Sequence, residues 1–366
     1  MGKIYTALGL MSGTSMDGVD ASIIQSDGES KYKVISNKYF KYKENLYGEL
    51  ASLRDKINTS KDLKTLSNDL KSLEKEITIF HAEAVGKIIK ESNVEINFVG
   101  FHGQTIFHNP DEKISTQLGD GKLLSKLIKK TVVYNFRQND INNGGQGAPL
   151  SPVFHMLLKN KYKLKLPLII LNIGGIANVT VIDLKNHMYS QDIGPGNCLI
   201  DEWIRRNSKS KYDENGSIAK LGKINKIILN QALKNFSYNN NAKSYDIKDF
   251  DSFFVKGLSL EDGAANLTEY TSEILQRQLK IFIKDLNVNI LVAGGGRKNK
   301  FLIKSIEEKI NIPLKLIDDF EIDGDFVESQ AFAYLAIRSY RKLPISFPET
   351  TGCIKPSIGG VIVKNY

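Results

Sequence analysis

The chain has 366 residues, a length typical of about two domains, and 41% of them are hydrophobic, which is enough for a sizeable core. Its net charge is +9, but the basic residues are mostly scattered lysines without an arginine cluster, so nucleic-acid binding is not expected. Two cysteines are too few for a disulfide framework, and no apolar run approaches the roughly 18 residues of a membrane helix. We therefore expect a cytoplasmic globular protein with neither nucleic-acid nor membrane partners.

The chain is expected to open with three strands, at residues 4–10, 19–25 and 32–40. The loop between the first two is rich in Gly, Ser, Thr and Asp. Successive N–H groups of such a loop can surround an anion, and the hydroxyls of Ser12, Thr14 and Ser15 add donors. The carboxylates that follow, Asp17 and Asp20, fit better beside a divalent cation than beside a bare phosphate. The alternative is a polar hairpin loop without a ligand.

The next segments predict an α/β domain. Apolar residues recur at three- and four-residue steps over 60–92, which predicts a helix, and a short strand follows at 96–101. That strand ends in His102-Gly103-Gln104-Thr105, at the carboxyl end where ligands bind in open α/β sheets. The spacing of His102 and His108 is unusual for zinc. The remaining elements expected in this domain are a helix at 122–130, a strand at 132–136 and a helix at about 152–159.

A second α/β domain is expected from about residue 166. It begins as the first does, with a strand at 168–173, a polar turn at 174–178 and a return strand at 179–182, which suggests an internal duplication. The other expected elements are helices at 198–206, 216–236, 260–285, 299–310 and 328–342, and strands at 289–293 and 313–317.

Three glycine-rich turns, at 12–18, 174–175 and 294–296, each lie at the end of a strand. Together they fit a nucleotide held in a cleft between two α/β halves, although the third alone could be a tight strand–helix junction. Neither the P-loop pattern nor the dinucleotide-binding pattern is present.

Three single residues are candidates for chemistry. Asp192 reads as part of a turn before a helix, and its carboxylate is either a general base or a cap of that helix or turn. Glu328 is expected to begin a helix, where it either contacts a substrate or caps that helix. Cys198 has no histidine motif to support a nucleophilic role, so a buried structural thiol is expected.

Taken together, the motifs resemble those of the anhydro-N-acetylmuramic acid kinase family, and they occur in family order over nearly the whole chain. They are Gly9–Asp20 (GLMSGTSMDGVD), His102–Thr105, Phe136-Arg137 with Asp140, Gly144–Leu150, Asn172–Asn178, Gly194–Asn197, Ala293–Asn299 and Thr350–Gly352. One departure is Asn135, where the family usually has Asp.

The resemblance implies an α/β fold of two actin-like, ribonuclease H-like domains with a nucleotide cleft between them. The first domain would comprise residues 1–163 and 345–366, and the second 164–344. The implied reaction opens the 1,6-anhydro ring of 1,6-anhydro-N-acetylmuramic acid with water and phosphorylates the 6-oxygen from ATP. The product, N-acetylmuramic acid 6-phosphate, belongs to peptidoglycan recycling. The alternatives are a kinase for another sugar or amino sugar, and a non-catalytic actin-like ATP-binding module.

The resemblance also assigns roles to residues. Asp192 is expected to be the general base, and His102, Gln104 and Glu328 are expected to bind the amino sugar. Mg²⁺ is expected with ATP, near Asp17 or Asp20, and a homodimer is the expected assembly. The residues expected to bind ATP are Gly13, Thr14, Ser15, Met16, Asp17, Gly18, Val19, Asp20, Gly174, Gly175, Gly294, Gly295, Gly296 and Asn299.

Overall fold

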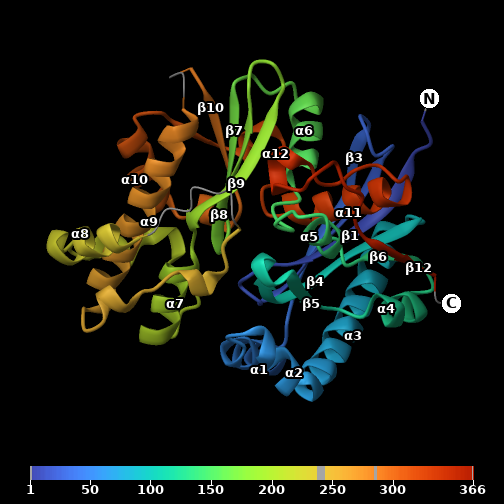
Figure 1. The fold of residues 1–366 in the computed structure, drawn as a ribbon, viewed down its shortest axis with the longest axis horizontal. Helices are drawn as coiled ribbons and strands as arrows, with labels where there is room; N and C mark the ends of the chain where they lie inside the picture. Colours follow the sequence, from blue (N-terminus) through green and yellow to red (C-terminus); the bar gives the residue numbers. More distant parts are fainter. Residues whose placement is uncertain (1, 237–243, 284–286, 365) are drawn as a thin grey trace. The chain divides into compact units, whose positions relative to one another are not determined.

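The computed structural model describes residues 2–236, 244–283, 287–364 and 366, and the fold is α/β (Figure 1). Contacts divide the chain into two compact units, Met1–Leu164 with Phe326–Tyr366, and Lys165–Asp325. Each unit contains one sheet. Among the described residues, no helix is long and apolar enough to span a membrane.

The sheet of the first unit has the order β12-β6-β4-β1-β2-β3, and β5 pairs with β4. The three predicted opening strands are present and form an antiparallel meander, while β4 and β6 run parallel to β1. The strands are β1 (Tyr5–Ser12), β2 (Gly18–Ser26), β3 (Tyr32–Lys41), β4 (Phe98–Asn109), β5 (Ile114–Leu118), β6 (Thr131–Tyr134) and β12 (Val361–Val363).

The sheet of the second unit repeats this plan, with the order β11-β10-β7-β8-β9. Again three antiparallel strands come first, and the next two lie parallel to the first of them. The strands are β7 (Leu168–Ile173), β8 (Ile176–Ile182), β9 (Met188–Pro195), β10 (Asn289–Ala293) and β11 (Leu314–Leu316). The shared order is the ribonuclease H-like topology, and it agrees with the predicted duplication.

Two helical features of the first unit differ from the prediction. Helix α1 was not predicted, and the expected helix at 60–92 is interrupted at Leu66, where φ is −94° and ψ 18°. Apolar side chains of α1 and α3 pack on one face of the sheet in a single core cluster. The helices are α1 (Glu44–Lys56), α2 (Ser60–Thr65), α3 (Ser67–Ser92), α4 (Gly121–Ile128), α5 (Gln138–Asn142), α6 (Pro152–Lys161), α11 (Val327–Tyr340) and α12 (Pro348–Thr351).

Helix α11 packs directly on the first sheet, where glycines allow a close approach. Gly9 of β1 and Gly100 of β4 are paired in register. A Cβ atom on Gly9 would lie 1.9 Å from the Ser329 carbonyl oxygen, and one on Gly100 would lie 2.3 Å from that of Phe332. Because of this packing α11 belongs to the first unit, so the division falls after residue 325 and not at the expected 344/345.

The helices of the second unit surround two apolar clusters. Only residues 226–235 of the expected helix 216–236 form an α-helix, because the preceding chain lies against the start of α9: a Cβ on Gly222 would lie 2.0 Å from the Glu261 carbonyl oxygen. Residues 284–285, at the end of the expected helix 260–285, lie outside the described residues. The helices are α7 (Cys198–Asn207), α8 (Lys226–Asn235), α9 (Leu260–Phe282) and α10 (Lys300–Ile310).

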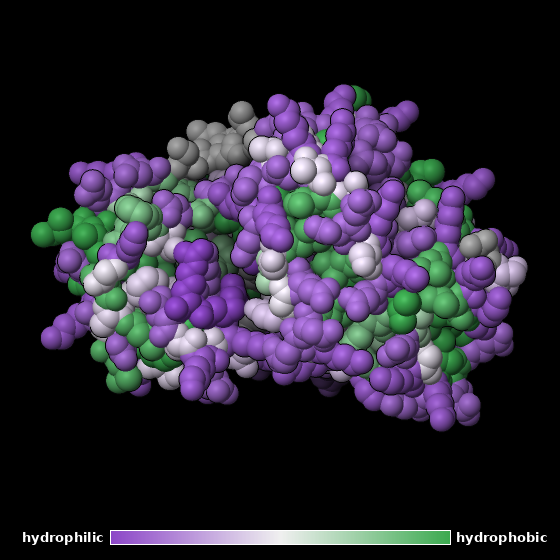
Figure 2. Space-filling view, turned by 90° about the horizontal axis from the view of Figure 1, so that it is seen from below, coloured by the Kyte–Doolittle hydropathy of each residue, from purple (hydrophilic) through white to green (hydrophobic). Residues whose placement is uncertain are grey.

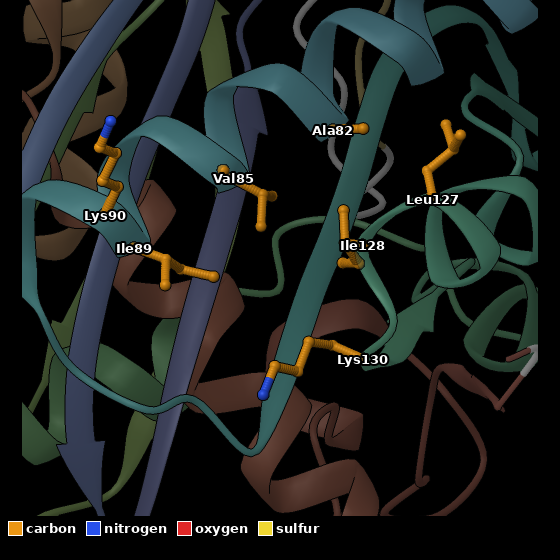
Figure 3. Close-up of a pocket in the computed structure, with 8 residues that line it drawn as sticks. Ala82, Val85, Ile89, Lys90, Leu127, Ile128 and Lys130 are labelled. Carbon is orange, nitrogen blue, oxygen red and sulfur yellow. The ribbon is translucent and has the colours of Figure 1, made fainter.

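The surface carries hydrophilic residues over much of the face seen in Figure 2, with hydrophobic residues in patches between them. A shallow groove of about 420 Å³ lies between α3 and α4, lined by apolar side chains such as Val85, Ile89 and Leu127, with Lys90 and Lys130 beside them (Figure 3). None of the residues that line this groove is a predicted site residue.

Candidate active site

The predicted phosphate loop is a tight turn between β1 and β2. The Met16 N–H donates to the Gly13 carbonyl oxygen at 3.2 Å, and Met16 has a φ of 57°. The Met16 side chain is buried and anchors the turn in the core, whereas Thr14 and Ser15 are exposed at its tip. The turn therefore presents hydroxyl and backbone groups to solvent from a fixed base.

Ser12 fixes the start of this turn and is not available to a ligand. Its buried hydroxyl lies 2.9 Å from the Tyr42 hydroxyl and 3.2 Å from His81 Nε2. His81 Nδ1 donates to the Ile77 carbonyl oxygen, so Nε2 is the acceptor of the Ser12 proton. Burial lowers the pKa of His81 to about 4, which keeps the ring neutral. The expectation that the Ser12 hydroxyl contacts an anion is therefore wrong.

The two carboxylates of the loop are partly buried. Asp17 Oδ1 accepts a hydrogen bond from Ser15 Oγ at 2.6 Å, and Asp20 lies on β2, paired with Met11. Burial first, and then the charges of Asp17 and Asp20, raise the pKa of the Tyr39 hydroxyl. The loop is thus a locally anionic site, which is suited to a cation.

His102 and Gln104, the two predicted sugar-binding residues of β4, are both buried. The Nδ1 of His102 donates to the Gly103 carbonyl oxygen at 2.7 Å, and its Nε2 accepts from Arg137 Nη2 at 2.9 Å. Burial, and then the Arg137 charge, hold the pKa of His102 well below its usual range. Because both ring nitrogens are engaged, His102 supports Arg137. Gln104 Nε2 donates to the Gly13 carbonyl oxygen at 2.9 Å, and Gln104 Oε1 is buried without a partner in the described chain.

Three further motifs of the first unit meet at Asp140. Its buried carboxylate accepts from the Gly147 N–H at 2.7 Å and from Thr351 Oγ1 at 2.7 Å, and Arg137 donates to the Gly147 carbonyl oxygen at 2.8 Å. Asn135, where the family usually has Asp, is exposed and has a φ of 54°, which Asn tolerates well. The buried carboxylate of this network is therefore Asp140, and residue 135 lies outside the network.

The glycine turns of the second unit pack together at one edge of its sheet. Gly174 and Gly175 alone form the turn between β7 and β8, and their carbonyl oxygens accept from the N–H groups of Asn197 and Gly196 at 2.8 and 2.9 Å. The loop after β10 lies beside them, since a Cβ on Gly296 would be 2.3 Å from Ile173 Cγ2. The carboxyl ends of β7, β9 and β10 thus come together, as expected for a ligand site in an α/β sheet.

The three consecutive glycines differ in their surroundings. A Cβ on Gly294 would lie 2.5 Å from Asn172 Oδ1, and Gly294 has a φ of 78° and a ψ of 172°. A Cβ on Gly295 would lie no nearer than 4.0 Å to any atom, the nearest being Asn197 Nδ2. Gly294 and Gly296 therefore serve close packing, and Gly295 faces open space.

Arg297, for which no role was predicted, holds this loop in place. Its guanidinium donates to both oxygens of Asp318 at 2.7 and 3.0 Å, to Asp325 at 2.8 Å and to the Gly294 carbonyl oxygen at 3.1 Å. Burial acts to raise the pKa values of Asp318 and Asp325. Hydrogen bonds outweigh this effect and lower both pKa values: they come first from Arg297, and then from the Gly324 N–H to Asp318 and from Lys298 to Asp325. Asn299, predicted to bind ATP, accepts from the Leu302 N–H at 3.0 Å and caps α10.

Asp192 lies inside strand β9, directly opposite Asn178 of β8. Its Oδ2 accepts from the Tyr245 N–H at 2.9 Å. Helix α7 begins only at Cys198, after the N-cap residue Asn197. The interpretation of Asp192 as a helix cap is therefore wrong, as is its placement in a turn.

Burial raises the pKa of the Cys198 thiol to about 12, which argues against a nucleophilic thiolate.

Glu328, the third predicted sugar-binding residue, is the second residue of α11 and is partly buried. Its carboxylate lies in the first turn, where the helix dipole favours a negative charge. The next residue, Ser329, hydrogen-bonds the Ser22 hydroxyl at 2.7 Å and ties this turn to β2. Glu328 is therefore held on the first sheet.

A duplicated ribonuclease H-like fold with glycine turns at strand ends in both units defines an α/β protein of the actin-like class. The family model described as "Anhydro-N-acetylmuramic acid kinase" matches residues 5–365. The chain therefore belongs to the anhydro-N-acetylmuramic acid kinase family. Proteins with that name from Pelagibacter ubique (strain HTCC1062) and Zymomonas mobilis subsp. mobilis are 58% and 38% identical to it. The first match covers 100% of both chains, and the second covers 97% of this chain and 99% of the relative.

Matches among solved structures are more distant. They include a ROK family glucokinase from Streptomyces griseus in complex with glucose and AMPPNP, which is 10% identical, with a TM-score of 0.40, covering 90% of this chain and 98% of that chain. The family membership argues against both alternatives raised from the sequence, a kinase for a different sugar and a non-catalytic ATP-binding module.

Proposed function

We propose that the chain opens the 1,6-anhydro ring of 1,6-anhydro-N-acetylmuramic acid with water and transfers the γ-phosphoryl group of ATP to the freed 6-oxygen. Family membership supplies the enzyme class, a kinase that acts on an amino sugar with ATP. The observation that carries the residue assignment is the position of Asp192 on β9, near the strand ends where the glycine turns gather.

Asp192 is the general base of the proposed reaction. Water attacks the anomeric carbon and gives one proton to the Asp192 carboxylate, while the bond from that carbon to the 6-oxygen breaks. The negative charge that develops on the 6-oxygen is consumed as this oxygen attacks the γ-phosphorus and ADP leaves. The Tyr245 N–H, bonded to Oδ2, holds the carboxylate in place during this step.

The phosphates of ATP are proposed to bind to backbone N–H groups of the 13–20 loop and of the turns at 174–175 and 294–296, where Gly295 leaves open space. No group of three or more His, Cys, Asp or Glu side chains among the described residues could hold a metal ion. The residues therefore fit Mg²⁺ bound mainly by the phosphates, with Asp17 or Asp20 as a carboxylate partner, which is the usual mode for this ion.

The sugar is proposed to contact Gln104 and Glu328 directly, and His102 only through Arg137. The buried Gln104 Oε1 has no partner in the described chain, and a bound hydroxyl group would supply one. The engaged ring of His102 supports its role as a positioning residue. We further propose that the chain forms a homodimer and that it is located in the cytoplasm.

The test is the variant Asp192→Asn, assayed in water enriched in heavy oxygen. Asn keeps an acceptor for the Tyr245 N–H but cannot take a proton, so turnover should fall by about 10²–10⁴-fold while ATP affinity is retained. In the wild-type product the heavy oxygen should appear on the anomeric carbon. Near-normal turnover of the variant, or heavy oxygen in the phosphate ester, would contradict the assignment.

A further inference from the structure

The second sheet carries a row of three polar side chains next to its glycine turns. Asn172 of β7 is paired with Asn178 of β8, and Asn178 is paired with Asp192 of β9. Residues directly opposite one another in antiparallel strands point to the same face of the sheet, with Cβ atoms about 4.5–5.5 Å apart. The first and last residues of the NIGGIAN motif therefore line up with Asp192, because the two-residue turn at 174–175 fixes their register.

This row lies on the face opposite the apolar core of the sheet. The residues that alternate with it, Ile173, Ala177 and Ile193, all belong to the core cluster packed against the other face. The register shifts beside the row, where Ile193 is accommodated as an extra residue of β9. Such bulges occur next to active sites, where they interrupt strand pairing.

Asn178 is the member of the row that the chain itself leaves unsatisfied. Its Oδ1 is buried, and among the described residues nothing donates a hydrogen bond to it. A buried amide oxygen without a partner is costly and calls for a bound water or ligand. Its neighbour across the strands is the carboxylate proposed as the general base.

We propose that Asn178 is a second catalytic residue, which holds the attacking water against Asp192. The water donates one O–H group to the Asn178 amide oxygen and gives its other proton to Asp192, so that a lone pair of its oxygen points at the anomeric carbon. No proton passes to Asn178. This inference rests on the proposed role of Asp192.

The test compares kinetic constants of Asn178→Ala, Asp192→Asn and the double variant. Misplacing a reacting group by about 1 Å can cost about 10²-fold, so Asn178→Ala should lower kcat by roughly that factor with little change in the KM for ATP. In the Asp192→Asn background the same change should cost little more, because both residues act on one water. Asn178→Ser, which keeps an acceptor oxygen, should recover part of the activity. Thr180→Val is the control, because Thr180 lies on the same strand and face as Asn178 but outside the row. Its kcat should stay within about twofold of the wild-type kcat.

The outcomes separate this inference from the proposed function. If Asp192→Asn is impaired while folded Asn178→Ala keeps its kcat, the role of Asn178 is overturned and the base assignment stands. Additive losses in the double variant, or a raised KM for ATP as the sole effect, would overturn it too. If Asp192→Asn keeps full activity, the proposed base itself fails. Should Asn178→Ala not fold, Asn178→Ser decides: an unchanged kcat with no coupling to Asp192→Asn refutes the inference.

Discussion

Alanine substitutions at the three consecutive glycines should separate nucleotide contact from packing. In Gly294→Ala the side chain meets Asn172 Oδ1 at 2.5 Å, and the backbone conformation is one that essentially only Gly adopts. Such strain costs about 1–3 kcal/mol, and overpacking adds a similar amount, so we expect a loss of about 2–6 kcal/mol in the free energy of unfolding. Gly296→Ala, which places its Cβ 2.3 Å from Ile173 Cγ2, should lose about 1–3 kcal/mol.

Gly295→Ala should behave in the opposite way. Its Cβ has no neighbour within less than 4.0 Å, so the free energy of unfolding should stay within about 1 kcal/mol of the wild type. ATP affinity should nevertheless fall at least about tenfold, or ~1.4 kcal/mol, because the methyl group occupies the space proposed for phosphate.

Urea unfolding, followed by fluorescence, measures the three stabilities. The single tryptophan, Trp203, is buried in the second unit and reports on it directly. Titration with an ATP analogue measures affinity. Wild-type affinity in folded Gly295→Ala, or a destabilisation as large as that of Gly296→Ala, would refute the reasoning.

Gly13→Val should leave thermal unfolding unchanged, because the atom nearest to its Cβ is 3.9 Å away, but should abolish ATP binding; normal affinity would exclude the phosphate role. Gly100→Ala should cost about 1–3 kcal/mol in urea unfolding, since its Cβ would meet the Phe332 carbonyl oxygen at 2.3 Å, and a wild-type midpoint would contradict the close packing of α11. Burial lowers the pKa of His81 and of His155 from 6.5 to about 4, so unfolding takes up protons between these values. Stability should therefore fall as the pH drops below 6.5, by ~1.4 kcal/mol per unit for each ring, and His81→Gln should reduce this slope; a slope that His81→Gln leaves unchanged would argue against the neutral buried ring.

Elements with a strong local pattern were predictable from the sequence. The opening strands of each unit either alternate apolar and polar residues or are continuously apolar, and glycine-containing turns separate the first two. The hairpin that opens each unit, and the duplication that the two hairpins indicate, could therefore be recognised. Strand β9 could not, because its sequence holds Asp192 and ends in Gly and Pro, which are poor strand formers. Its pairing with β8 is a tertiary effect. The placement of Asp192 in a turn followed from that missed strand.

The supporting contacts of the site had no local signal either. Asp140 and Thr351 are 211 residues apart in sequence and meet only in the folded first unit. Arg297 could be recognised as part of a motif, but its carboxylate partners, Asp318 and Asp325, lie 21 and 28 residues further along. The prediction that a strand ends at His102 was wrong, because β4 continues to Asn109 and pairs with β5 beyond this residue. The contact of His102 with Arg137 in the buried interior had no local signal either. Residue type and spacing do not determine which polar groups a fold encloses.

The order of the chain has a consequence for its synthesis. The first unit is discontinuous, and the second, Lys165–Asp325, is inserted within it. While the ribosome is still making the second unit, the strands that carry Gly9 and Gly100 have already emerged, but the helix that covers them does not yet exist. The later unit is contiguous and can complete its core first, although domains generally fold from the N-terminus onward during translation. The sheet of the nascent first unit therefore lacks the packing of α11, and one of its faces stays open to water and to other chains, until Val327–Tyr340 leaves the exit tunnel.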